Sequence, residues 1–124
     1  MGTSVTPLST LPRPISDTES TLVVDPDDRI LAGHYPGFPI FPGVCLVETA
    51  HQTYLATRPD PDAVTLEGID SVRFLGPVFP GDEVTTRLSV KPRPDGSLRC
   101  TATLSTARGA AATVRLRYTG EVAR

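Results

Sequence analysis

Residues 33–52 read Gly-His-Tyr-Pro-Gly-Phe-Pro-Ile-Phe-Pro-Gly-Val-Cys-Leu-Val-Glu-Thr-Ala-His-Gln and change character half-way along. Prolines at positions 36, 39 and 42 fix backbone angles and remove amide donors, so the first half predicts a rigid loop. No proline or glycine occurs from Val44 to Arg58, and Pro59 ends this run. The pattern predicts a helix with Pro42 near its first position and Gly43 in its first turn.

The loop and the first turns of this helix carry three kinds of chemical group. His34, near the start of the loop, can take or give a proton near neutral pH. Glu48 has mostly apolar neighbours along the helix, and a carboxyl group in such surroundings can act as an acid. The amides of Gly43 and Val44 can hold an oxygen that becomes negative. A base, an acid and oxyanion donors together favour removal of a proton next to a carbonyl group.

Length and charge exclude several classes of protein. A chain of 124 residues predicts one domain, and its net charge of −2 indicates no nucleic-acid partner and no attraction to an acidic membrane. No stretch approaches the roughly 20 apolar residues of a membrane helix. The N-terminus lacks the charged start and long apolar run of a signal peptide, so we expect a cytoplasmic protein.

The two cysteines, Cys45 and Cys100, are interpreted as buried free thiols. A disulfide between them and a catalytic thiol are the alternatives. A cysteine metal site needs more ligands at closer spacing, so no metal is expected.

The remaining chain predicts an antiparallel sheet. Residues 1–19 are rich in Ser, Thr and Pro and predict a flexible or extended leader, with a short edge strand around residues 5–8. The domain is expected to span residues 20–124. Strands are predicted at 21–24, 64–74, 83–91, 98–104 and 112–118, with a bulge at Gly68 and the last three joined as a meander. The fold class is therefore α+β, with about five antiparallel strands curled around one apolar helix.

Two separated segments resemble a known family. The first comprises His34-Tyr35-Pro36-Gly37, Pro39-Ile40-Phe41-Pro42-Gly43-Val44, Glu48 and Gln52. The second comprises residues 68–74 and 77–82. Both resemble the signature of the bacterial 3-hydroxyacyl-acyl-carrier-protein dehydratases of the FabZ and FabA kind. The resemblance covers roughly residues 30 to 90 and implies a hot-dog fold, in which the sheet wraps a central helix.

The resemblance also implies an activity and its parts. The substrate would be a (3R)-3-hydroxyacyl thioester on the phosphopantetheine arm of an acyl carrier protein, and the product a trans-2-enoyl thioester. His34 would be the base, Glu48 the acid, and Gly43 and Val44 the oxyanion donors, with Gln52 orienting the carboxylate. No metal or other cofactor is implied. Two subunits would pair as a homodimer or heterodimer, each site taking its histidine from one chain and its carboxylate from the other.

Alternatives remain open at this point. The pathway could be fatty-acid or polyketide and other secondary-metabolite biosynthesis. A hot-dog acyl thioesterase would share the fold and the thioester, and a related hydratase would run the same chemistry backwards on coenzyme A esters. The chain could also be a non-catalytic subunit of a heterodimeric dehydratase. His51, one residue before Gln52, is interpreted as pointing elsewhere and as non-catalytic.

Overall fold

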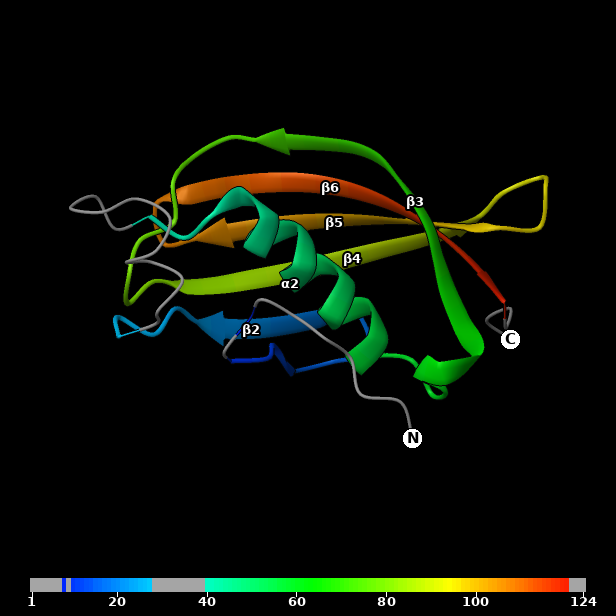
Figure 1. Cartoon of the computed structure of the whole chain (residues 1–124), viewed down its shortest axis with the longest axis horizontal. Coiled ribbons are helices and arrows are strands. Elements are labelled where there is room, and N and C mark those ends of the chain that lie inside the picture. The colour runs from blue at the N-terminus through cyan, green and yellow to red at the C-terminus, as the bar shows by residue number, and fades with distance from the viewer. Residues whose placement is uncertain (1–7, 9, 28–39, 121–124) are drawn as a thin grey trace.

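The computed structural model describes residue 8, residues 10–27 and residues 40–120. In this part of the chain one α-helix lies against a six-stranded antiparallel sheet of order β1-β2-β4-β5-β6-β3 (Figure 1). The elements are β1 (Arg13–Pro14), β2 (Glu19–Val23), α2 (Gly43–Ala56), the short 3-10 helix η1 (Pro61–Ala63), β3 (Val64–Phe74), β4 (Glu83–Pro92), β5 (Leu98–Thr106) and β6 (Gly109–Gly120). The predicted α+β class, the helix and the five predicted strands are confirmed.

The sheet has one strand more than expected, and that strand lies in the predicted leader. β1 pairs with β2, placing Arg13 opposite Thr21. Leu8 and Pro12 are buried, so this part of residues 1–19 packs onto the domain. The predicted boundary between residues 19 and 20 falls inside β2. Most of the edge strand expected around residues 5–8 lies outside the described part of the chain.

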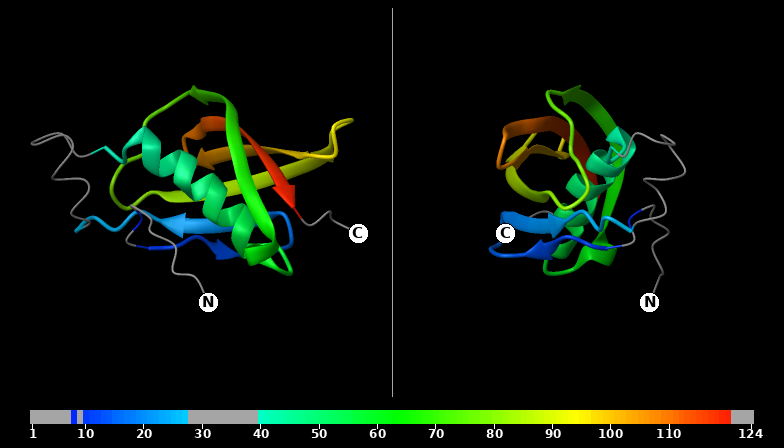
Figure 2. Two further views of the ribbon diagram at one scale, coloured as in Figure 1. Left: turned by 45° about the vertical axis from the view of Figure 1, so that its right-hand side comes forward. Right: turned by 90° about the vertical axis from the view of Figure 1, so that its left-hand side faces the viewer.

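The sheet curls around α2, as the two turned views in Figure 2 show. β4, β5 and β6 form the predicted meander, and alternate residues of each strand are buried. β3 follows the helix in the sequence but pairs with β6, at the opposite edge of the sheet from β1. The connection that contains α2 therefore carries the chain from the β1–β2 side of the sheet to the opposite edge, and α2 is covered on its sheet side by apolar side chains.

The core lies between α2 and the sheet. Cys45 and Cys100 are both fully buried and are not joined by a disulfide, as predicted. Burial raises the pKa of the Cys100 thiol to about 12, so this thiol stays protonated at neutral pH. The helix ends at Ala56, before the predicted end near Pro59, and Thr57 closes it with its amide donating to the Thr53 carbonyl at 3.1 Å.

β3 is irregular where the sequence predicts a bulge. Its pairing with β6 shifts between Leu66 and Gly68 and again between Ile69 and Ser71. A side chain at Gly68 would place its Cβ 2.8 Å from Nη2 of Arg117, so glycine allows that arginine to cross the strand.

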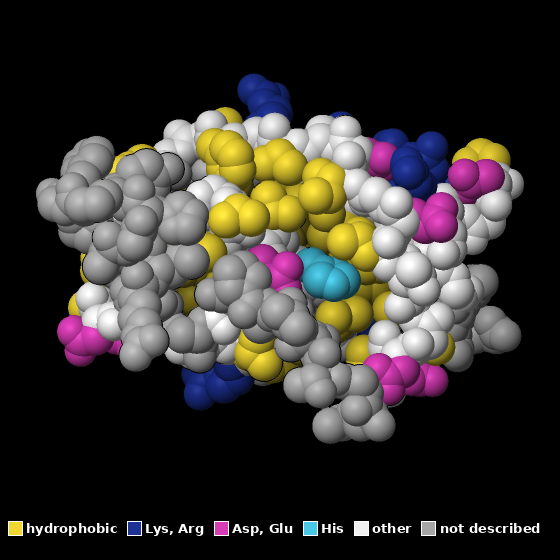
Figure 3. Space-filling model, viewed as in Figure 1, with side chains coloured by type: hydrophobic (Ala, Val, Ile, Leu, Met, Phe, Trp, Pro, Cys, Tyr) yellow, Lys and Arg dark blue, Asp and Glu magenta, His cyan; other side chains and the backbone are white. Residues whose placement is uncertain are grey.

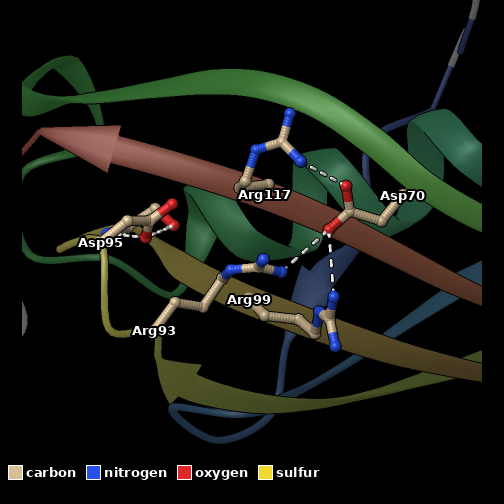
Figure 4. Close-up of polar contacts among 6 residues, drawn as sticks. Asp70, Arg93, Asp95, Arg99 and Arg117 are labelled. Carbon is tan, nitrogen blue, oxygen red and sulfur yellow. Dashed lines mark hydrogen bonds and ion pairs between the residues drawn. The ribbon is translucent and has the colours of Figure 1, made fainter.

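Asp70 in β3 holds three arginines on the sheet face opposite α2 (Figure 4). Its Oδ1 lies 2.5 Å from Nη1 of Arg117, and its Oδ2 lies 3.6 Å from guanidinium nitrogens of both Arg93 and Arg99. Arg99 precedes the buried Cys100 in β5 and so points away from the core. Asp70 therefore joins β3, β5 and β6 and the start of the β4–β5 connection, and lies on the far side of the sheet from the helix.

Candidate active site

The start of α2 places Gly43 and Val44 as its first two residues, with Pro42 before them. The first backbone bonds inside the helix run from the amides of Cys45 and Leu46 to the carbonyl of Pro42, at 2.9 and 3.4 Å. The amides of Gly43 and Val44 come before these bonds and have no acceptor within the helix. Their position at the positive end of the helix agrees with the sequence, and their role as oxyanion donors stays a prediction.

The second resembling segment supports this helix start. The amide of Phe41 donates to the carbonyl of Val78 at 2.7 Å, which ties the end of the loop to the segment after β3. The ring of Phe74 lies against Gly43, where an added Cβ would be 2.7 Å from Cζ of Phe74. The two segments, separated in the sequence, therefore meet at one end of α2. Glycine at position 43 lets the aromatic ring lie directly on the backbone.

Glu48 lies in the second turn of α2 and is half-buried. The side-chain amide of Gln52 donates to its Oε2 at 2.7 Å, and Gln52 itself is only 9% exposed. The predicted contact between these two side chains is therefore present. Among the described residues no partner lies within hydrogen-bond distance of Oε1. Gln52 therefore holds Oε2 and leaves Oε1 without a partner among the described residues.

His34, the predicted base, falls within residues 28–39, outside the described part of the chain. The pairing of His34 with Glu48 therefore stays a prediction.

His51 differs from its prediction. It does not point away from the site, because it lines the same pocket as Gln52. Its Nδ1 lies 2.8 Å from the hydroxyl of Tyr118. Burial lowers the pKa of His51, and the Glu48 carboxylate opposes this shift in part. Its spacing of three residues from Glu48 was the sequence signal that placed both on one side of the helix.

The face that carries α2 is largely apolar. Figure 3 shows a histidine and an acidic side chain next to each other, surrounded by hydrophobic side chains. In the ranges 10–27 and 40–120, no group of three or more His, Cys, Asp or Glu side chains could hold a metal ion. Nor does any helix there have the length and apolar character needed to cross a bilayer. A carboxyl group, an imidazole and free helix amides are the reactive groups that this face offers.

Comparison with known proteins agrees with this arrangement. Residues 14–113 match the protein family described as ApeI-like, ApeI dehydratase. A 3-hydroxyacyl-[acyl-carrier-protein] dehydratase FabZ of Yersinia enterocolitica is 37% identical over 106 residues, covering 70% of this chain and 63% of that protein. The chain thus spans less than two thirds of the length of this curated relative.

Solved structures show the same fold at lower identity. The dehydratase heterocomplex ApeI:P from Xenorhabdus doucetiae contains a chain with a TM-score of 0.69 and 18% identity, covering 93% of this chain and 99% of that one. The fluoroacetyl-CoA-specific thioesterase FlK, as a mutant, has a TM-score of 0.66 and 15% identity, covering 82% of each chain. The predicted hot-dog fold is confirmed.

The family match runs from the second residue of β1 to the first residues of β6, and so spans most of the described domain. It also includes Glu48, Gln52 and the helix start that the two resembling segments build. The chain belongs to the ApeI-like family, whose model is described as a dehydratase.

Proposed function

We propose that this protein removes water from (3R)-3-hydroxyacyl thioesters carried by an acyl carrier protein, giving trans-2-enoyl thioesters. The observation that carries the proposal is the hydrogen bond from Gln52 to Glu48, in the same helix whose first two amides have no acceptor within the helix. The match to the ApeI-like family and the likeness to FabZ dehydratases support it.

The reaction divides among four groups. His34 takes the proton from the carbon next to the thioester carbonyl, and the amides of Gly43 and Val44 stabilise the oxygen that becomes negative. Glu48 gives its proton from Oε1 to the departing hydroxyl group, which leaves as water. Gln52 donates to Oε2 of Glu48 and so keeps Oε1 directed at the substrate. The thioester acidifies the proton that is removed, so we expect no metal or other cofactor beyond the phosphopantetheine arm.

The site is proposed to be completed by a second subunit, a copy of this chain or a homologous hot-dog chain. β3 pairs with β6 on one side and with no other described strand on its other side. Ile69 and Phe74 on this strand are 53% and 56% exposed, and a long exposed edge strand with apolar side chains favours pairing with another chain. The likeness to a subunit of the ApeI:P heterocomplex supports a heterodimer as one form of this assembly.

The test is to incubate the purified protein with a 3-hydroxyacyl carrier protein and follow the intact mass of the carrier. Loss of one water supports dehydration. Release of the free carrier thiol would instead identify a thioesterase. Activity only after addition of a homologous subunit would identify a heterodimer.

Two variants test the assigned groups. We expect His34→Ala and Glu48→Gln each to lower the rate by ~10²–10⁴-fold while the fold survives, because removal of a proton-transfer group commonly has this effect. Near-full activity of either variant would reject its role. Circular dichroism and thermal unfolding of each variant serve as the control for folding.

A further inference from the structure

A pocket of about 630 Å³ lies beside the last turns of α2, next to the candidate acid. Its walls come from the segment before β1, from the end of α2, from η1 and from the start of β3. Leu55, Val64 and Leu66 contribute apolar side chains, His51 and Gln52 add polar groups on the helix side, and Asp62 and Thr65 add polar groups opposite. Pockets that combine apolar walls with a few placed polar groups are typical of binding sites for small molecules.

An aromatic stack holds the His51 side chain in place. Its ring is stacked with that of Tyr118, with centroids 5.8 Å apart and planes at 14°. Tyr118 stacks in turn on Tyr54, with centroids 3.8 Å apart. Both tyrosines are fully buried, so the stack is part of the core and gives the imidazole one orientation at the pocket wall.

The hydrogen bond to Tyr118 decides which imidazole nitrogen carries the proton. Burial raises the pKa of the Tyr118 phenol and lowers that of His51, so both groups are neutral near pH 7. The phenol proton needs an acceptor, and among the described residues the Tyr118 hydroxyl has one partner, Nδ1 of His51 at 2.8 Å. The phenol therefore donates to Nδ1, and Nε2 carries the imidazole proton.

This places a hydrogen-bond donor on the helix side of a pocket whose other walls include Leu55, Val64 and Leu66. Within residues 10–27 and 40–120, Nε2 of His51 has no acceptor at hydrogen-bond distance. His51 is half-buried, and a ligand oxygen beside Nε2 would give this donor an acceptor inside the pocket.

Gln52 connects this pocket to the candidate acid, because it both lines the pocket and donates to Glu48. Leu55 lies seven residues beyond Glu48, which corresponds to about 10 Å along the helix axis. A thioester whose hydroxyl group faces Glu48 can therefore extend its acyl chain along α2 into the pocket.

We propose that this pocket receives the part of the acyl group remote from the thioester, and that Nε2 of His51 donates to an oxygen atom on that part. The preferred acyl group thus carries a carbonyl, hydroxyl or ether oxygen in its distal half. His51 is a specificity-determining residue, and Tyr118 is the positioning residue that sets its tautomer. This inference rests on the proposed dehydratase function.

The test compares 3-hydroxyacyl carrier-protein substrates of equal chain length, with a keto group scanned along the distal half and with a plain hydrocarbon chain. We expect kcat/KM to favour the best keto substrate by ~10-fold, the range of one hydrogen bond to a partly buried donor. His51→Leu should bring this ratio close to one. His51→Gln keeps a donor and should retain part of the preference. Tyr118→Phe keeps the ring stacking but removes the hydrogen bond to Nδ1 of His51, so that either imidazole nitrogen can carry the proton. It should therefore lower the ratio less than His51→Leu does.

A ratio near one for the unmodified protein, or an unchanged ratio in His51→Leu, would overturn the inference. Failure of the proposed function would be seen separately, as absence of dehydration with every substrate. In that case the pocket is tested by calorimetry. The measurement compares the affinity of the protein for saturated acyl carrier proteins with and without the distal keto group. Tighter binding of the keto form that is lost in His51→Leu supports the pocket, and equal binding rejects it.

Discussion

The side-chain amide of Gln52 donates to Oε2 of Glu48 at 2.7 Å, across one turn of α2. Oε2 accepts this hydrogen bond, and in the proposed mechanism Oε1 gives the proton to the substrate. We expect Gln52→Met, which keeps the length of the side chain and removes the donor, to lower kcat by ~10-fold, because hydrogen bonds to ionisable groups contribute about 1.5–3 kcal/mol. The measurement is kcat for dehydration over a range of pH, and the profile should differ in shape from that of the unmodified protein.

Thr57→Ala is the matched control for this prediction. It removes a side-chain hydrogen bond at the end of the same helix, from Oγ1 of Thr57 to the Thr53 carbonyl, and does not touch Glu48. Its kcat and pH profile should match those of the unmodified protein. If Gln52→Met and Thr57→Ala behave alike, Gln52 has only a structural role.

Cys100 gives the stability of the protein a pH dependence in the alkaline range. Burial raises the pKa of its thiol from 9.0 to about 12, so the folded state keeps a proton that the unfolded state loses. The free energy of unfolding is therefore unaffected by Cys100 below about pH 9 and falls as the pH rises toward 12. Between pH 8 and pH 10 we expect this group to account for a loss of about 1 kcal/mol.

Urea unfolding at pH 8, 9 and 10 measures this loss. Cys100→Ala is less stable at every pH, because it leaves a small cavity, but its pH dependence over this range should be weaker. The range stops at pH 10 because buried Tyr54 and Tyr118, whose pKa values burial also raises, add the same kind of dependence above it. Parallel curves for the two proteins would contradict the prediction.

Asp70 is expected to matter for stability although it lies on the outer face of the sheet. Its side chain is 18% exposed and lies between Arg93, Arg99 and Arg117. Asp70→Asn would leave three like charges together, so we expect the free energy of unfolding to fall by about 1–2 kcal/mol. Added salt should reduce this loss by screening the arginines from one another.

The exposed ion pair between Glu19 and Arg87 provides the comparison. Arg87 is 71% exposed and bonds Glu19 at 2.6 Å, an arrangement that contributes little in water. Glu19→Gln should change the free energy of unfolding by less than about 0.5 kcal/mol. Equal changes in the free energy of unfolding for Asp70→Asn and Glu19→Gln would show that the arginines around Asp70 contribute no more to stability than the exposed ion pair.

We predict that replacing Gly120, at the end of β6, by any residue with a side chain destabilises the protein. Its φ is 112°, and an added Cβ would lie 2.2 Å from the carbonyl oxygen of Ala63, a backbone atom that cannot rotate away. We expect Gly120→Ala to lower the free energy of unfolding by about 3 kcal/mol or more, from backbone strain and overlap together.

Gly96→Ala separates these two causes. Gly96 has a φ of 90° with no atom within 4 Å of its added Cβ, so this variant has the backbone strain without the overlap. It should cost about 1–2 kcal/mol in urea unfolding. A loss for Gly120→Ala no larger than that for Gly96→Ala would show that the chain around Ala63 adjusts freely.

Local features of the chain were sufficient to predict much of this structure. Proline and glycine at positions 42 and 43 indicated the start of α2, and alternation indicated β4, β5 and β6. The contact of Gln52 with Glu48 could be predicted because residues four apart on a helix are neighbours. Each of these signals acts over a few residues, so no knowledge of the rest of the fold was needed.

Packing between distant segments settled the rest. Tyr118 lies 67 residues from His51 in the sequence, and its hydroxyl lies 2.8 Å from Nδ1 of that histidine. Likewise, the partners of Asp70 depend on β3 crossing the helix to pair with β6. Such contacts follow from strand order and register, which many segments set together through burial of a shared core. A pattern of residues along the chain carries no direct signal of which of its distant neighbours will meet.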